Sequence, residues 1–299
     1  MRNLDLDSLD IFRTVATEGG ILRAASKLHR VQSNVTTRIK QLEQRLGRPL
    51  FRRQGRGLVL SPEGELLLSY AQRLFRLADE AESELRSGRA MGVLRIGSLE
   101  STAGSRLAPL LSRYHAEHPG VVVELATGTT GALLQRVTQY ELEAAFVSEP
   151  FTSGGLGSMK VFDEELVLIT GRGQRAVRRA ADLAGLSMVA FASGCSYRQR
   201  LEDWLGASSL RPARTLELAS YQAMIACVAA GTGFAVVPRS LLVALKAADE
   251  VLQHELPARV RRNRTHLVWS GTPSTALSRL QDLLKAMPAE DTVKASRRR

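Results

Sequence analysis

The fold of the N-terminal part is decided by one stretch, ILRAASKLHRVQSNVTTRIKQLEQRL, which spans residues 21–46. Apolar residues recur at helical spacing over residues 21–29 and again over residues 32–46, with only a short break between the two patterns. Gly47 follows the second pattern, at a position where a glycine ends a helix well. Two short helices joined by so tight a turn predict a helix-turn-helix, in which the second helix enters the major groove of DNA.

The N-terminal positions of the second helix carry side chains that suit base recognition. Gln and Asn bridge adenine, Arg grips guanine, and Ser or Thr bonds a phosphate or a base edge. The sequence therefore predicts DNA contacts from six residues of this helix: Gln32, Ser33, Asn34, Thr36, Thr37 and Arg38.

Basic charge is concentrated around the same unit. Residues 23–56 contain ten Lys or Arg residues against a single acid, Glu43, in a chain whose net charge is +11. Residues 49–60 predict a β-hairpin, or wing, that would bring its arginines to flanking phosphates or to the minor groove. A helix pair with a merely solvated basic face is the alternative, but the succession of helix, turn, helix and basic hairpin argues against it. Further DNA contacts are expected from Arg23, Arg30, Arg52, Arg53 and Arg56.

A long helix is predicted after the wing, from Ser61 as N-cap and Pro62 at the first helical position to about Arg86. Its apolar residues follow the alternating three- and four-residue spacing of a coiled-coil seam. The helix could pack on its own domain, but its length and its charged remaining faces favour a second copy of the chain. The predicted dimer residues are Leu67, Tyr70, Leu74, Leu77 and Ala81.

The sequence changes in character after residue 90. Short β-rich runs alternate with amphipathic helices, which is the α/β pattern, and the length suits two lobes with a cleft between them. The predicted domains are residues 1–61, a winged helix-turn-helix that binds DNA; residues 62–90, a linker and dimerisation helix; and residues 91–299, a two-lobed effector-binding domain.

Five motifs together resemble the LysR-type transcriptional regulators: AASKLH (24–29), VQSNVT (31–36), QLEQRLG (41–47), PLFRR (49–53) and LSPEG (60–64). The resemblance covers the whole N-terminal domain and the linker helix; in the remainder, length and lobe order match better than motifs do. It implies a periplasmic-binding-protein-like effector domain, a dimer or dimer of dimers, and an interrupted palindromic promoter site that begins with T and ends with A.

The family's functional positions carry over only where the residues match. Gln32 matches the base-reading glutamine, and Arg52 and Arg53 match the basic residues of the wing. Ser33 departs from the family's common proline and Asn34 from its common alanine. Both departures lie at the reading end of the helix, so we expect an operator that differs from the average member's.

In a two-lobed α/β domain, ligands bind where strands end and helices begin, because free backbone N–H groups gather there. The strand ends predict effector contacts from Ser98, Ser101, Thr102, Thr129 and Ser196, with Arg198 as a partner for a carboxylate. Each of these residues could instead cap a helix. As a set they predict a small polar or anionic effector. Residues 231–234 resemble the hinge segment of the LysR-type family, which implies a structural role and not a ligand contact.

Three features of the sequence could point to a function other than DNA-binding regulation. Cys195 at a predicted helix N-terminus suggests a redox sensor, although its presumed partner Cys227 lies 32 residues away. Residues 171–176 fit a dinucleotide fingerprint loosely, without the acidic residue expected about 20 positions later. The pair His115 and His118 has no third ligand for zinc. We therefore expect no enzyme, no cofactor and no metal, and the absence of a signal peptide argues against a solute receptor for transport.

The expected location and partners follow from the same features. Residues 1–12 carry acids where a signal peptide needs basic and then apolar residues, and no apolar run is long enough for a transmembrane helix. We expect a cytoplasmic protein without a membrane partner. Its expected partners are double-stranded promoter DNA, a small-molecule effector, further copies of itself and RNA polymerase.

Overall fold

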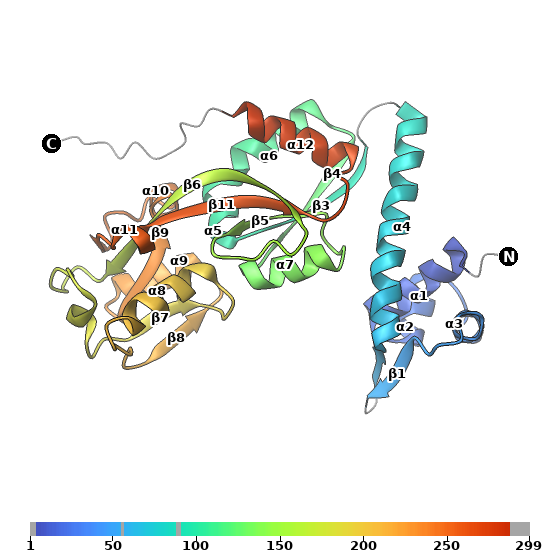
Figure 1. The fold of residues 1–299 in the computed structure, drawn as a ribbon, viewed down its shortest axis with the longest axis horizontal. Coiled ribbons are helices and arrows are strands. Elements are labelled where there is room, and N and C mark those ends of the chain that lie inside the picture. Colours follow the sequence, from blue (N-terminus) through green and yellow to red (C-terminus); the bar gives the residue numbers. More distant parts are fainter. Residues whose placement is uncertain (1–3, 55–56, 88–90, 288–299) are drawn as a thin grey trace. The chain divides into compact units, whose positions relative to one another are not determined.

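The computed structural model describes residues 4–54, 57–87 and 91–287. The chain divides into two compact units, residues 1–88 and 89–299. The long helix predicted as a separate linker is grouped with the N-terminal unit. Each unit is described by itself, with the labels of Figure 1.

The first unit is a winged helix-turn-helix. Asp5 caps its first helix by accepting from the backbone N–H of Ser8, and Gly19 and Gly47 end the first and third helices with positive φ angles of 64° and 66°. The third helix begins and ends where the sequence predicts. The elements are α1 (Leu6–Glu18), α2 (Ile21–Lys27), α3 (Gln32–Leu46), β1 (Phe51–Gln54), β2 (Gly57–Leu60) and α4 (Pro62–Ser87).

The second unit contains two α/β lobes (Figure 1). The first lobe holds β3 (Gly92–Ser98), α5 (Glu100–Thr102), the π-helical turn η1 (Ala103–Leu107), α6 (Ala108–Glu117), β4 (Val121–Thr127), α7 (Thr130–Thr138), β5 (Ala144–Ser148) and α12 (Thr275–Ala286). The second lobe holds the 3-10 turn η2 (Ala180–Leu183), β7 (Met188–Phe191), α8 (Ser196–Gly206), β8 (Thr215–Leu218), α9 (Tyr221–Ala229), β9 (Phe234–Pro238), α10 (Arg239–Ala244), β10 (Leu252–His254) and α11 (Ala258–Arg261).

Two long strands join the lobes, β6 (Gly157–Thr170) and β11 (Arg262–Trp269). They connect the described strands into the order β4-β3-β5-β11-β6-β9-β7-β8, with β10 also paired to β6. β6 pairs antiparallel with β11 over residues 157–165 and then with β9 over residues 166–170. One strand therefore belongs to both lobes, so β6 runs through the junction between them.

The sheet of the first lobe is covered on both faces, as Figure 1 shows, with α6 and α12 on one side and α7 on the other. β5 illustrates the alternation: Ala144 and Phe146 pack with α6 and α12, whereas Ala145 and Val147 pack with α7. Burial on both faces explains why β5 is a continuous apolar run in the sequence.

Among the described residues, no helix is both long enough and apolar enough to cross a bilayer.

Candidate nucleic-acid interface and interlobe site

One face of helix α3 is buried in the core of the first unit, and the opposite face is exposed. Val35, Ile39 and Leu42 are buried in the core of the first unit. At about 100° per residue, Ser33 and Thr37 fall on the opposite face, and both are exposed. Gln32 and Asn34 are also exposed in the first turn. The N-terminal end of α3 thus presents polar side chains from a position fixed by apolar packing.

Two predicted contact residues of α3 already have partners in the protein. The hydroxyl of Thr36 donates to the carbonyl of Gln32 at 2.9 Å, and Nη2 of Arg38 lies 3.6 Å from Oδ2 of Asp7. Lys40, which the sequence analysis did not include among the DNA contacts, is exposed on the face of Ser33 and Thr37. Residues three positions apart share one face of a helix, so the sequence alone could have placed Lys40 beside Thr37.

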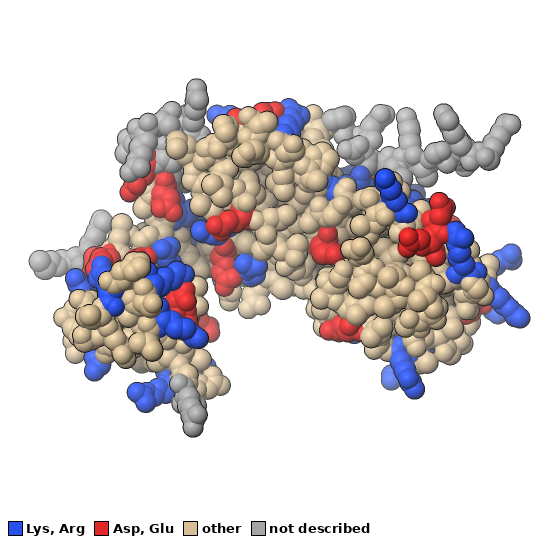
Figure 2. Space-filling view, turned by 180° about the vertical axis from the view of Figure 1, so that it is seen from behind, with Lys and Arg blue, Asp and Glu red and all other residues tan. Residues whose placement is uncertain are grey.

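Acidic residues of α1 and its N-cap neutralise part of the basic surface. They form three close ion pairs: Asp5–Arg45 at 2.8 Å, Asp7–Arg30 at 2.6 Å and Glu18–Lys27 at 2.6 Å. Within the described ranges, no carboxylate forms an ion pair with the remaining basic residues of this region, Arg23, Lys40, Arg48, Arg52 and Arg53. In Figure 2 the smaller unit, at the left, shows blue basic side chains gathered on its visible face.

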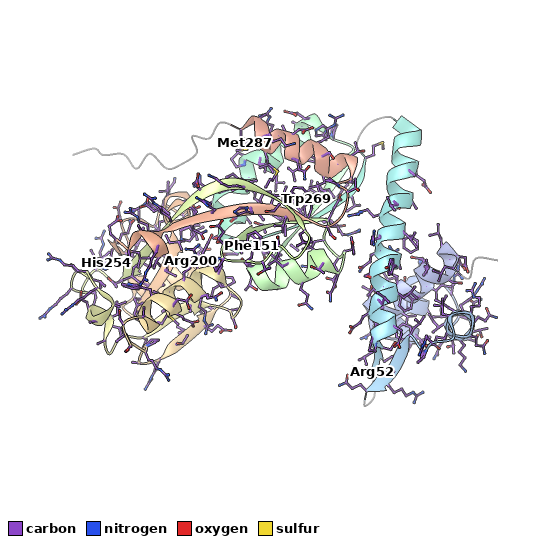
Figure 3. All side chains as sticks on the ribbon, viewed as in Figure 1. Arg52, Phe151, Arg200, His254, Trp269 and Met287 are labelled. Carbon is purple, nitrogen blue, oxygen red and sulfur yellow. The ribbon has the colours of Figure 1, made fainter. Side chains whose placement is uncertain are left out.

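The wing is the antiparallel hairpin of β1 and β2, with Arg52 opposite Val59 and Arg53 opposite Leu58. Both arginines are exposed, and successive residues of a strand point to opposite sides, so the two guanidinium groups reach different faces of the wing. Figure 3 shows Arg52 near the tip of the hairpin. Arg56, the third predicted wing residue, lies outside the described residues.

The long helix α4 has two apolar stripes. Leu67 and Ala71 are buried in the core of the first unit, so the predicted dimer role of Leu67 needs correction. Leu66 next to it is 60% exposed and starts a row with the heptad-like spacing of four, four, three and four residues. The outer stripe consists of Leu66, Tyr70, Leu74, Leu77 and Ala81, all exposed.

Hydroxyl groups meet where the two lobes of the second unit touch. Thr130 Oγ1 of α7 lies 3.4 Å from Ser196 Oγ of α8, and it also accepts from the backbone N–H of Ser148 at 3.3 Å. The amide of Asn263 on β11 donates to Ser148 Oγ at 2.7 Å. All four residues are buried. We call this set, Thr130, Ser148, Ser196 and Asn263, the interlobe hydroxyl cluster.

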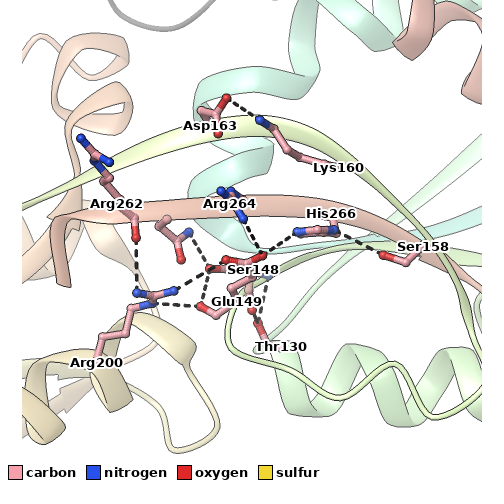
Figure 4. Close-up of polar contacts among 11 residues, drawn as sticks. Thr130, Ser148, Glu149, Ser158, Lys160, Asp163, Arg200, Arg262, Arg264 and His266 are labelled. Atoms are coloured by element: carbon pink, nitrogen blue, oxygen red, sulfur yellow. Dashed lines mark hydrogen bonds and ion pairs between the residues drawn. The ribbon is translucent and has the colours of Figure 1, made fainter. Parts of the chain in front are cut away.

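An arginine joins the lobes beside this cluster (Figure 4). Arg200 of α8 donates to the carbonyl of Glu149 at 3.1 Å and to the carbonyls of Arg259 and Arg262 at 3.0 and 3.3 Å. The carboxylate of Glu149 in turn contacts His266 Nε2 at 3.0 Å. Sequence analysis missed Arg200, since all its hydrogen bonds go to residues more than fifty positions away.

Most of the predicted effector residues of the first lobe are buried. Ser98, Ser101 and Thr102 are buried, and Thr129 caps α7 by accepting from the N–H of Ala132. Ser98 donates to the carbonyl of Leu99 at 2.9 Å. Among the described residues, Ser101 Oγ has no hydrogen bond of good geometry although it is 1% exposed. A buried hydroxyl without a partner is a candidate for a ligand contact.

Tyr197 and Glu100 complete the junction. Burial and the charge of Glu164 raise the pKa of the Tyr197 phenol, while the hydroxyls of Ser101 and Ser148 oppose this shift. Glu100 of the first lobe accepts from the backbone N–H of Tyr221, the first residue of α9, at 3.4 Å. Burial raises the pKa of Glu100. The hydrogen bond of Glu100 therefore connects the two lobes, and Tyr197 lies buried at the same junction.

Arg198, the predicted carboxylate partner, has its partners within the second lobe. It is held by two carboxylates, Glu202 at 2.8 Å and Glu217 at 2.7 Å, and by the carbonyl of Phe191. A carboxylate of an effector would have to compete with these two partners, and the expected role of Arg198 stays a prediction. Glu217 lies on β8, a strand whose pairing with β7 is not visible from the local sequence.

Cys195 is 5% exposed, and its Sγ lies 3.6 Å from the hydroxyl of Tyr221. Burial of this kind is typical of a structural cysteine and not of a reactive thiol. Within the part of the chain that the structure describes, no group of three or more His, Cys, Asp or Glu side chains is arranged to hold a metal ion.

Comparisons with known proteins agree with both units. Residues 6–65 match the bacterial regulatory helix-turn-helix proteins of the lysR family, and residues 87–289 match the LysR substrate binding domain. The HTH-type transcriptional regulator GltR of Bacillus subtilis is 37% identical over 254 residues, covering 85% of this chain and 86% of that protein. The regulator YofA of Bacillus velezensis is 36% identical over 288 residues, covering 95% and 99%.

Solved structures share the fold. A full-length OxyR variant from Pseudomonas aeruginosa has a TM-score of 0.73 at 20% identity and covers 97% of both chains. CbnR in complex with its target DNA has a TM-score of 0.66 at 22% identity and covers 94% of this chain and 99% of that one. With two family matches that span both units, and relatives that are transcriptional regulators and not enzymes, this chain belongs to the LysR family of DNA-binding transcriptional regulators.

Proposed function

We propose that the chain binds a palindromic promoter site as a dimer or dimer of dimers and responds to a small polar effector at the interlobe site. The N-terminal end of α3 reads base edges through Gln32, Ser33, Asn34 and Thr37, and the wing arginines hold the phosphates. The observation that carries this proposal is the exposed polar end of α3, fixed by its buried face, in a unit whose wing exposes Arg52 and Arg53. Promoter DNA as target places its action in the cytoplasm.

Base reading and phosphate binding predict different phenotypes at two residues. Gln32→Ala should remove about 1–3 kcal/mol of discrimination between the operator and random DNA, because a base contact is lost. Arg53→Ala should weaken both complexes alike and reduce the salt dependence of binding by about one phosphate contact. Titrations of an in vitro selected operator and a random duplex measure both. If Gln32→Ala left the discrimination unchanged, the proposed placement of the N-terminal end of α3 at base edges would be wrong.

The effector is proposed to be polar and small, because hydroxyl and amide groups dominate the residues that meet between the lobes. Arg198 already pairs with the carboxylates of Glu202 and Glu217, so the proposal does not use it to bind an anionic effector. Thr130, Ser148 and Asn263 extend the predicted set of Ser98, Ser101, Thr102, Thr129 and Ser196. In this proposal the domain bounds are those expected from the sequence, with residues 62–90 as linker and dimerisation helix.

Ser101→Ala tests this site without breaking a hydrogen bond of good geometry. The melting temperature of the free protein should change little, because the contact of the Ser101 hydroxyl with the Tyr197 phenol lacks good hydrogen-bond geometry. A screen of amino acids and small carboxylates should find compounds that raise the melting temperature, since a ligand that binds only the native state stabilises it. Ser101→Ala should shrink that rise, whereas Thr138→Ala, at the exposed far end of α7, should preserve it. Equal rises in both variants would remove Ser101 from the site.

A further inference from the structure

Asp7 occupies an unusual place beside the reading helix. It lies in the first turn of α1, and its carboxylate faces two arginines that the sequence assigns to DNA contacts. Arg30 approaches it with two nitrogens, Nη2 at 2.6 Å from Oδ1 and Nη1 at 3.5 Å from Oδ2. Arg38 approaches Oδ2 at 3.6 Å. One carboxylate therefore contacts the guanidinium groups on both sides of the reading end of α3.

The neighbouring acid Asp5 has a different task. It caps α1 by accepting from the backbone N–H and hydroxyl of Ser8, and it pairs with Arg45 at 2.8 Å. The Ser8 N–H, together with Arg45, lowers the pKa of Asp5 to about 2. Asp7 accepts from no backbone N–H among the described residues, and its hydrogen bonds go to Arg30 alone. The carboxylate of Asp7 thus pairs with arginines and does not cap α1.

The pairs of Asp7 are exposed enough to exchange. The side chains of Arg30, Arg38 and Asp7 are 34%, 43% and 46% exposed. Ion pairs at this exposure contribute about 0–1 kcal/mol, so a DNA phosphate can replace the carboxylate at small cost. A shallow groove beside them, lined by Arg38, Gln41, Gln44 and Arg45, leaves this flank of α3 open.

From this geometry we propose that Asp7 sets the discrimination between operator and random DNA, by competing with phosphates for Arg30 and Arg38. On random DNA, where binding is almost entirely phosphate contact, the competition lowers affinity. At the operator, base contacts hold α3 in the major groove, and Arg30 and Arg38 exchange the Asp7 carboxylate for phosphates of the DNA. The inference rests on the proposed placement of α3 at the DNA.

The test compares Asp7→Asn with Asp10→Asn. Both substitutions remove one negative charge from α1 and keep the side-chain shape, but Asp10 pairs with Arg13 on α1 at 2.7 Å and not with α3. The probe is a random duplex of about 40 base pairs, titrated by fluorescence anisotropy between about 50 and 300 mM KCl. The long-range effect of net charge is the same in both variants, so a difference between them reports the local contact.

Asp7→Asn should bind the random duplex about two- to five-fold more tightly than Asp10→Asn, the equivalent of one exposed ion pair. Affinity for a selected operator should change less, so the ratio of the two affinities should fall. In an Arg30→Ala, Arg38→Ala background, Asp7→Asn should have no effect beyond that of Asp10→Asn. This double-mutant comparison also reveals any effect that arises from folding alone.

The outcomes separate this inference from the proposed function. Equal affinities of Asp7→Asn and Asp10→Asn for the random duplex would overturn the role of Asp7 while leaving DNA reading by α3 intact. Weaker binding by Asp7→Asn would also overturn it, because Asp7 would then orient the arginines for DNA. If the unaltered protein bound the random duplex without any salt dependence, the proposed DNA interface itself would fail.

Discussion

Replacing Gly64 by Ala should unfold or severely loosen the first unit. A Cβ atom at Gly64 would lie 2.1 Å from the carbonyl oxygen of Leu50 and 2.9 Å from Cδ2 of Leu60. Real Cβ atoms do not approach a backbone oxygen so closely, so either α4 or the start of the wing must move. Overpacking of this kind costs about 3 kcal/mol or more when the neighbour cannot yield.

The backbone at Leu50 is held on several sides and has no room to yield. Its carbonyl accepts from the N–H of Ser61 at 2.9 Å, and its own N–H donates to Glu43 Oε1 at 2.8 Å. The hydroxyl of Ser61 donates to the carbonyl of Pro49 at 2.7 Å and accepts from the N–H of Gly64 at 3.0 Å. Moving Leu50 away from a new methyl group would break several of these bonds.

Hydrogen exchange resolved by peptide measures the effect, because it reports the two units separately. A loss of about 3 kcal/mol should raise exchange across α1 and α3 by about 100-fold, while peptides of residues 91–287 stay unchanged. The matched control is Gly20→Ala, where a Cβ meets nothing within 4 Å and φ is the extended 167°. Protection at Gly64→Ala equal to that of the control would show that the wing yields easily.

The sequence predicted α3 to the residue because every local signal agreed. The buried stripe of Val35, Ile39 and Leu42 has helical spacing, and Gly47 can adopt the positive φ that ends the helix. By contrast, the first half of β6, residues 157–164, cannot be assigned as a strand from its own sequence. Only Phe162 is buried in this segment, three of its eight residues are charged, and its partner β11 lies about a hundred positions away in the sequence.

The surroundings of Leu67 and Arg198 could not be predicted from the sequence for one physical reason. Each residue lies on a helix next to an equally plausible neighbour, and a rotation of the helix by one or two residues exchanges their environments. Leu66 and Leu67 are both apolar, but only the packing of α4 on the first unit decides which one is buried. Arg198 and Arg200 are both basic, and only the distant residues Glu217 and Glu149 decide which arginine faces the junction.

The outer stripe of α4 gives the second large effect: Leu74→Glu should abolish the dimer. Leu74 is 40% exposed at the middle of a row that includes Tyr70 and Leu77, both more than half exposed. Leucines and a tyrosine at this spacing bury their side chains against the same row of a second copy. A carboxylate in that seam would lose its hydration without a partner in each of the two chains, at a cost of about 3 kcal/mol, or 100-fold in the dimer dissociation constant.

Loss of the dimer should also lower the affinity for the operator. A dimer binds the two halves of a palindrome at once, and the second half is bound at a high effective concentration, so a monomer should lose about 100-fold or more in operator affinity. Sedimentation velocity measures the assembly and anisotropy measures the operator complex. Leu74→Met, which keeps an apolar side chain, should retain both properties, and Asp79→Lys, an exposed charge change away from the stripe, should retain the dimer. If Leu74→Glu sedimented like the unaltered protein, the outer stripe would not be the dimer contact, and α4 would serve only to complete the core of the first unit through Leu67 and Ala71.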